Sequence, residues 1–137
     1  MACEYKLRVR TYECDSYGHV NNANYLNFLE VGRFEYLRQV GFDYKELLVD
    51  GYGIFVARIE IDYKRPAVAD DEIVITTWPI KKGAVSVAVG QRITRGSDII
   101  VEAKVNCALV DAKGTPTRLP EKYNVPGLNP EPTPEIK

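Results

Sequence analysis

One stretch of this 137-residue sequence has the length and pattern of a long helix, and the segments after about residue 54 have the pattern of strands. The helix is expected from Ala23 to Gln39, with Gly41 placed to end it and a shorter helical piece from Asp43 to Val49. Its apolar residues recur at helical spacing on one face: Tyr25, Phe28, Leu29, Gly32 and Tyr36, with Leu26, Leu37 and Val40 beside them. A single long helix can be buried by a sheet only if the sheet wraps around it.

The expected strands are long, and most are joined by short links. Apolar and polar residues alternate in the first of them, and the others are rich in Ile and Val; they span residues 4–12, 54–65, 72–80, 84–95 and 98–111. The links around Gly83 and Gly96 predict antiparallel hairpins. The fold class is therefore α+β, a long helix wrapped by a curved antiparallel sheet of about five strands. The outer face of that sheet needs a cover, which a second subunit could supply.

Composition is that of one ordinary folded domain. The hydrophobic fraction is 45% and the charged fraction 27%, and we expect the domain to cover residues 1–125. Six of the eight prolines lie between Pro116 and Pro134, so residues 126–137 are expected to form an irregular, exposed tail. The net charge of −1 gives no sign of a nucleic-acid-binding protein, which usually carries a basic excess.

The three cysteines, Cys3, Cys14 and Cys107, are odd in number and widely spaced. They predict neither a disulfide framework nor a structural zinc site, and reduced thiols fit a cytoplasmic protein. The N-terminus lacks the apolar core of a signal peptide, and no stretch approaches the roughly 18 apolar residues of a membrane span. With one histidine in the chain, we expect no metal site and no cofactor.

Residues 15–25, DSYGHVNNANY, join the first strand to the long helix and hold the residues best suited to chemistry. Free backbone N–H groups at a helix start favour developing negative charge, so a carbonyl oxygen docked there would be polarised. The carboxylate of Asp15 could then attack the carbonyl carbon or activate water. The alternative is structural: Asp15 caps a turn, Asn21 or Asn22 caps the helix, and His19 is an ordinary loop residue.

The same segment resembles the D-x-x-G-H-V-N-N-x-x-Y signature of the 4-hydroxybenzoyl-CoA thioesterase branch of the hotdog superfamily. The resemblance continues in L-x-x-L-E-x-G-R-x-E-Y-L over residues 26–37 and in IEIDYKRPA over residues 59–67, and it covers roughly residues 4–120. It implies a hotdog fold and an enzyme that hydrolyses acyl-CoA thioesters, with coenzyme A as part of the substrate. The motif does not specify the acyl group.

The resemblance also implies roles for single residues. The position of Asp15 is that of the nucleophile or general base, and the backbone N–H at Asn22 polarises the thioester carbonyl. His19 and Tyr25 match positions that line or brace the site. Sites in this family form between two subunits, which implies a homodimer or homotetramer in which Tyr63 and Lys64 face the neighbour's Asp15.

Two pairs of basic residues are candidates for binding the coenzyme A phosphates: Lys64 and Arg65 at a strand end, and Lys81 and Lys82 in a hairpin. An ordinary solvated turn or sheet edge is the simpler interpretation of both pairs.

Glu30 and Arg33 lie three residues apart on the helix, and we expect them to form an ion pair. The sharper alternative makes Glu30 the catalytic acid, because another hotdog branch carries a helix glutamate.

Three other functions stay open at this point. One is a hotdog-fold enoyl-acyl hydratase or dehydratase, which would release no thiol from a saturated acyl-CoA. Another is a non-catalytic acyl-CoA-binding protein, which would not need Asp15. The third keeps the hydrolase but exchanges coenzyme A for acyl carrier protein as the carrier.

Overall fold

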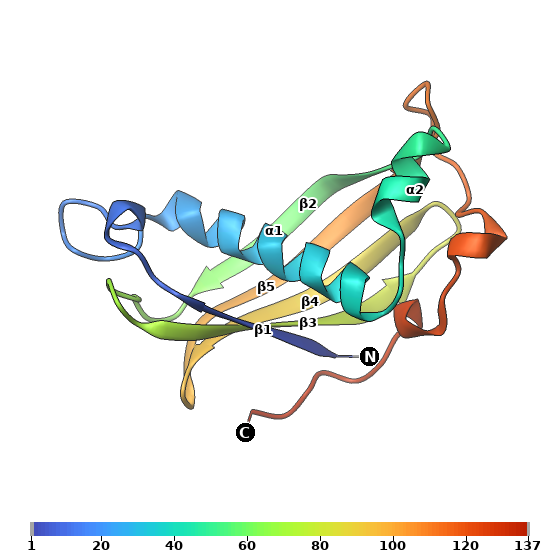
Figure 1. Ribbon diagram of the computed structural model, residues 1–137. Coiled ribbons are helices and arrows are strands. Elements are labelled where there is room, and N and C mark those ends of the chain that lie inside the picture. Colours follow the sequence, from blue (N-terminus) through green and yellow to red (C-terminus); the bar gives the residue numbers. More distant parts are fainter. Residues whose placement is uncertain (1, 137) are drawn as a thin grey trace.

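The computed structural model describes residues 2–136, and it consists of one long helix lying on a curved five-stranded antiparallel sheet (Figure 1). The strand order across the sheet is β1-β3-β4-β5-β2. The elements follow the chain in this order: β1 (Cys3–Arg8), the 3-10 turn η1 (Thr11–Glu13), α1 (Asn22–Gln39), α2 (Tyr44–Val49), β2 (Gly53–Tyr63), β3 (Glu72–Lys82), β4 (Ser86–Arg95), β5 (Asp98–Val110), and the 3-10 turns η2 (Glu121–Tyr123) and η3 (Pro126–Leu128). The predicted fold class and the predicted antiparallel arrangement are confirmed.

The buried face of α1 is the predicted one: Tyr25, Phe28, Leu29, Gly32 and Tyr36. Gly32 is the point of closest approach to the sheet, since a Cβ atom there would lie 2.4 Å from Cγ2 of Ile75 in β3. The helix ends where predicted, and Gly41 has the left-handed φ of 77° that lets the chain turn away. No helix among the described residues is both long and apolar enough to cross a membrane.

The first strand is shorter than the sequence suggests. The alternation to Tyr12 predicted a strand over residues 4–12, but β1 ends at Arg8. The Glu13 carboxylate accepts a hydrogen bond from the Arg10 backbone N–H at 2.7 Å. This local contact stabilises the η1 turn at the place where the strand was expected to continue. The four later strands begin and end within two residues of the predicted bounds.

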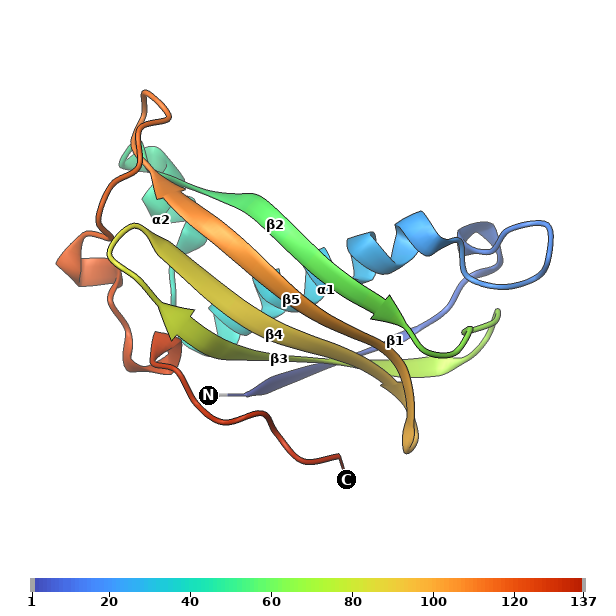
Figure 2. The same cartoon turned by 180° about the vertical axis from the view of Figure 1, so that it is seen from behind.

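The two edges of the sheet differ in how α1 covers them. α1 packs mainly on β1, β3 and β4, so the inner side of β2 is left largely uncovered. Figure 2 shows β2 at the edge of the sheet beside β5. On β2 the inner residues are apolar but half-exposed, with Val56 47% and Tyr63 48% accessible. The residues that alternate with them, Arg58 and Glu60, are charged and form an ion pair on the outer side.

The Pro-rich C-terminal segment has little regular structure beyond η3, but it is not wholly exposed. Leu128 is 8% accessible and belongs to a buried cluster with Tyr36 and Phe42. The Tyr36 hydroxyl donates a hydrogen bond of 2.6 Å to the Gly127 carbonyl, which fixes η3 against the end of α1. Farther along, the Glu131 N–H donates to the Pro79 carbonyl at 3.0 Å.

Candidate active site

Asp15 lies in a tight turn that precedes α1. Its N–H donates to the His19 carbonyl at 2.8 Å, and its carbonyl accepts from the Gly18 N–H at 3.0 Å. One carboxylate oxygen, Oδ1, accepts from the Tyr17 N–H at 2.9 Å, and Gly18 supplies the positive φ of 79° that the turn requires. The turn therefore holds the exposed Asp15 carboxylate in a defined position before the N-terminus of α1.

His19 is exposed, and its backbone rather than its ring carries the contacts that fix the loop. It forms an antiparallel bridge with Val68, and the adjacent Val20 N–H donates to the Ala67 carbonyl at 2.8 Å. These bonds close residues 15–19 onto the segment that follows β2.

Asn21, not Asn22, caps α1. The Asn21 side chain accepts from the Ala23 N–H at 2.9 Å, and the Asn21 carbonyl accepts from the Asn24 N–H at 2.8 Å. The N–H of Asn22, the first helical residue, has no hydrogen-bond acceptor within residues 2–136. A free N–H at a helix N-terminus is the kind of group that stabilises an oxyanion.

The rings of Tyr25 and Tyr63 contact each other at the same helix start in a tilted arrangement, with centroids 5.6 Å apart. Tyr25 is only 4% accessible, and its hydroxyl accepts a hydrogen bond of 2.9 Å from the buried Ala67 N–H. Burial raises the pKa of Tyr25 above its ordinary value. Tyr63 donates to the Asn22 carbonyl at 3.2 Å, so its hydroxyl contacts the helix start of its own chain. Both tyrosines brace the segment that carries Asn22.

The candidate lysines fall at two ends of the molecule. Lys64 follows β2 and is exposed beside the helix start, next to Tyr63. Lys81 and Lys82 end β3 at the opposite end of α1, near α2 (Figure 1). Lys82 donates to the side chain of Asn124, whereas Lys81 is exposed. Within one chain, the structure does not bring Lys81 and Lys82 together with Asp15.

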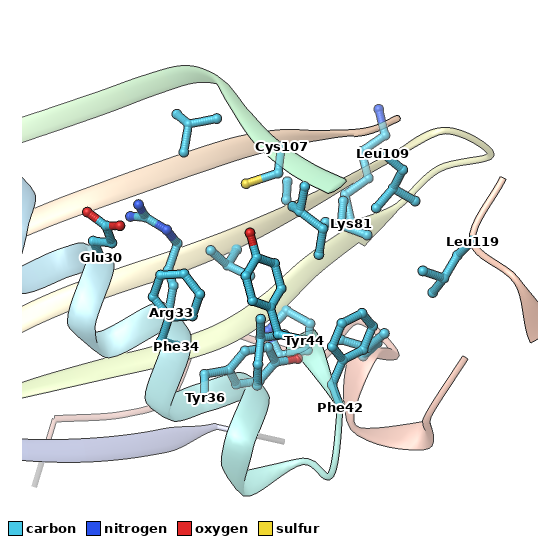
Figure 3. A pocket seen from close by; sticks show the side chains of 18 residues that line it. Glu30, Arg33, Phe34, Tyr36, Phe42, Tyr44, Lys81, Cys107, Leu109 and Leu119 are labelled. Atoms are coloured by element: carbon cyan, nitrogen blue, oxygen red, sulfur yellow. The ribbon is translucent and has the colours of Figure 1, made fainter. Parts of the chain in front are cut away.

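A cavity of about 180 Å³ lies at that second end, between the C-terminal half of α1 and the sheet (Figure 3). Its lining is largely apolar. The charged side chains Glu30 and Lys81 lie at its exposed side, and Arg33 is half-buried. Its walls come from α1, α2, β2, the β3–β4 hairpin, β5 and the C-terminal segment. Analysis of the sequence missed this cavity, although Leu119 and Leu128 were isolated apolar residues in an otherwise polar, Pro-rich segment and could have signalled it.

The expected ion pair between Glu30 and Arg33 is wrong. Arg33 turns toward the sheet, where its guanidinium donates to the Gln91 side-chain carbonyl at 3.1 Å. Gln91 is buried and donates in turn to the Leu29 carbonyl at 2.9 Å. Burial lowers the pKa of Arg33, and burial also raises the pKa of the neighbouring thiol of Cys107. Glu30 is thereby left exposed at the cavity, unpaired with Arg33.

No group of three or more His, Cys, Asp or Glu side chains placed to hold a metal ion occurs among residues 2–136.

Comparison with known proteins gives the family and the fold. The family model described as "Thioesterase-like superfamily" matches residues 9–127. The long-chain acyl-CoA thioesterase FadM of Escherichia coli is 32% identical over 110 residues, which cover 79% of this chain and 83% of that one. The chloroplastic acyl-acyl carrier protein thioesterase ATL3 of Arabidopsis thaliana is 29% identical over 119 residues. That match covers 85% of this chain, which spans only 63% of the length of the plant protein.

Among solved structures, a probable thioesterase from Bartonella henselae superimposes with a TM-score of 0.82 at 34% identity. The alignment covers 88% of this chain and all of that one, and it confirms the predicted hotdog fold.

Proposed function

The chain belongs to the thioesterase-like superfamily, and from this membership we propose that it hydrolyses acyl thioesters of coenzyme A or acyl carrier protein, with Asp15 as the reactive carboxylate. One observation carries the proposal. An exposed carboxylate is held by a closed turn before a helix whose first N–H, that of Asn22, has no acceptor in the described part of the chain. A carboxylate and an oxyanion donor are the two groups that thioester hydrolysis needs.

In the general-base route, Asp15 takes a proton from water as the water oxygen attacks the thioester carbonyl carbon. The Asn22 N–H stabilises the oxyanion that forms on the carbonyl oxygen. Collapse of the tetrahedral intermediate breaks the C–S bond, and the leaving thiolate takes the proton from Asp15. In the nucleophilic route, the carboxylate itself attacks, the thiolate leaves, and water then hydrolyses the mixed anhydride. Both routes consume one water and release one acid and one thiol.

Tyr25, Tyr63 and His19 have positioning roles in this proposal. The two tyrosines hold the helix start against the segment after β2, and the backbone of His19 closes the loop of Asp15. None of these groups needs to exchange a proton with the substrate. The same chemistry requires no Lewis acid, so we expect dialysis against a strong chelator to leave thiol release unchanged.

We propose further that the enzyme is at least a homodimer, formed by antiparallel pairing of two β2 edges. β2 is a free sheet edge whose inner residues are apolar and half-exposed. Two apolar side chains of α1, Leu26 and Phe34, are also exposed. In the dimer, α1 of the second subunit would lie over the inner face of β2 and cover these apolar side chains. Obligate interfaces of this kind usually bury more than about 2,000 Å² in total.

This pairing would bring the predicted residues at the helix start of one chain close to Lys81 and Lys82 of the other. In an antiparallel pair, the Tyr63 end of one β2 lies beside the Gly53 end of the other. Tyr63 is bonded to the helix start of its own chain, whereas Ile54 and Val56 at the other strand end line the cavity. Each Asp15 loop would therefore face the cavity of the neighbouring chain, with Lys81 and Lys82 near enough to bind carrier phosphates.

The test is Asp15→Asn, assayed by thiol release from acyl-CoA and acyl-acyl carrier protein substrates. We expect the rate to fall by at least ~10²-fold, the scale of a lost general base, with the circular dichroism spectrum unchanged. Glu30→Gln is the matched variant, because it neutralises the exposed carboxylate at the cavity and we expect it to keep most of the activity. Near-normal turnover of a folded Asp15→Asn protein, together with an inactive Glu30→Gln protein, would transfer the catalytic role to Glu30.

A further inference from the structure

The cavity is open at one side and closed at the other, and its lining residues change from exposed to buried between the two. Phe34 and Val56 are 40% and 47% accessible, and they mark the open side. Tyr36, Phe42 and Leu128 are 2%, 5% and 8% accessible, and they mark the closed end. The open side is the one that β2 pairing would place beside the neighbour's Asp15 loop.

The C-terminal segment closes that end. η3 carries Leu128 into the wall, and two contacts fix its position. The Gly127 carbonyl accepts the 2.6 Å hydrogen bond from Tyr36, and a Cβ atom on Gly127 would lie 2.5 Å from the side chain of Val40. Since α1 and η3 touch this closely, Leu128 is part of a rigid wall rather than of a loose tail.

The size of the cavity limits what can enter. A dry cavity of about 150 Å³ lined by Leu, Ile and Phe holds a benzene ring, which has six carbons. By the same scale a cavity of about 180 Å³ holds roughly seven carbons. Few of its lining side chains are polar, and the Tyr36 hydroxyl at the closed end already donates to the Gly127 carbonyl. A charged or strongly hydrated group at the closed end would therefore lose its water among mostly apolar side chains.

We infer that the enzyme selects apolar acyl groups of about six to eight carbons and that Leu128, at the closed end of the cavity, sets this limit. The inference rests on the proposed thioesterase function and adds to it the substrate class and the residue that measures chain length. The limit differs from the long-chain class that the name of FadM states for that relative. It also gives the C-terminal segment a role in specificity.

The main experiment measures kcat/KM for straight-chain acyl-CoA substrates from two to sixteen carbons. We expect a maximum at about six to eight carbons and a fall of at least ~10-fold by twelve, because each further methylene finds no apolar space. Leu128→Ala removes three carbons from the wall, so its maximum should move to longer chains by about two to three carbons. Leu119→Ala also removes three carbons, from a half-buried residue of the cavity wall, and should move the maximum in the same direction. This variant replaces Leu128→Ala in the test if Leu128→Ala fails to fold.

The matched control is Leu47→Ala. Leu47 is 1% accessible and belongs to the same buried cluster as Leu128, but it does not line the cavity. It should therefore lower stability by a similar amount and leave the chain-length profile unchanged. A maximum that moves equally in both variants would mean that loosening of the fold, and not the wall, sets the length.

A second arm separates this inference from the proposed function. Calorimetric binding of saturated alkanoates of four to sixteen carbons needs no catalysis, and we expect the tightest binding at six to eight. If that limit appears but no acyl thioester is hydrolysed, the cavity inference stands and the thioesterase proposal fails. If hydrolysis occurs but is fastest at fourteen carbons or more, or Leu128→Ala leaves the profile unchanged, the cavity inference fails alone. Absence of both binding and hydrolysis would refute both.

Discussion

Replacement of Tyr25 by Phe tests whether a buried hydroxyl holds the helix start in place. The Tyr25 hydroxyl is the acceptor for the Ala67 N–H, at 2.9 Å, and Ala67 is 0% accessible. Without the hydroxyl, this N–H is buried and unpaired, which costs about 1–3 kcal/mol of unfolding free energy. For a chain of this size, that corresponds to a fall in Tm of roughly 3–10 °C.

The matched control is Tyr63→Phe, which removes the neighbouring hydroxyl of the same pair of rings. Tyr63 is 48% accessible and its partner, the Asn22 carbonyl 3.2 Å away, can bind water instead. We expect its unfolding free energy to change by less than about 0.5 kcal/mol. Urea denaturation of both variants at one protein concentration gives the comparison, since the stability of an oligomer depends on concentration.

Loss of the Tyr25 hydroxyl should also affect catalysis. Since Tyr25 positions the segment that carries Asn22 and does not exchange protons with the substrate, Tyr25→Phe should lower kcat more than it raises KM. The shape of the pH–rate profile should stay that of the unaltered enzyme. Equal stability of Tyr25→Phe and Tyr63→Phe, or an unchanged Tyr25→Phe protein, would refute the reasoning.

Three further outcomes follow from contacts in the fold. Gly32→Ala should cost about 1–3 kcal/mol in urea denaturation despite the better helix propensity of Ala, because its Cβ would lie 2.4 Å from the fully buried Ile75. Burial alone would raise the pKa of Asp71, but hydrogen bonds from the Val68 N–H and the Arg95 guanidinium hold this pKa below its ordinary value. The ionised carboxylate therefore stabilises the fold above about pH 4, and this stabilisation is lost as the pH falls further. Asp71→Asn should accordingly lose less stability between pH 7 and pH 3 than the unaltered protein does. Ile59→Lys, on the inner side of β2, should shift the protein to monomer in sedimentation and lower activity, whereas Glu60→Lys on the outer side should do neither.

The sequence was enough to predict α1 and its buried face because those depend on local periodicity. Tyr25, Phe28 and Leu29 repeat at the spacing of a helix, and nothing elsewhere in the chain competes for them. The long strands were equally predictable, because β-branched residues and short Gly-containing links are local signals. The end of β1 was not, since a single contact between Arg10 and Glu13 outweighs the alternation.

The errors at the cavity have a different cause, which is contact between residues far apart in the chain. Arg33 bonds to Gln91, 58 residues away, so the local spacing to Glu30 did not decide its partner. Leu128 packs on Tyr36, and no pattern in a Pro-rich segment announces a contact across 92 residues. Local rules could place Asp15, Asn22 and Tyr25 at one helix start, but they could not reveal the space at the other end.

A mixed dimer would decide whether Asp15 acts on the cavity of its own chain or on that of its neighbour. One subunit carries Asp15→Asn, and the other carries Cys107→Phe, which fills the cavity from β5 (Figure 3). If each Asp15 faces the neighbour's cavity, one of the two sites in a mixed dimer keeps both an intact carboxylate and an intact cavity. If each Asp15 serves its own chain, every site carries one defect.

Random pairing of equal amounts of the two inactive variants makes half of all dimers mixed. With one working site in each mixed dimer, the mixture should therefore recover about one quarter of the activity of the unaltered enzyme. Each variant alone, checked for its fold by circular dichroism and for its dimeric state by sedimentation, should stay inactive. Mixtures that dimerise but recover no activity would place Asp15 and the cavity of one chain in the same site, and would contradict the antiparallel pairing of β2.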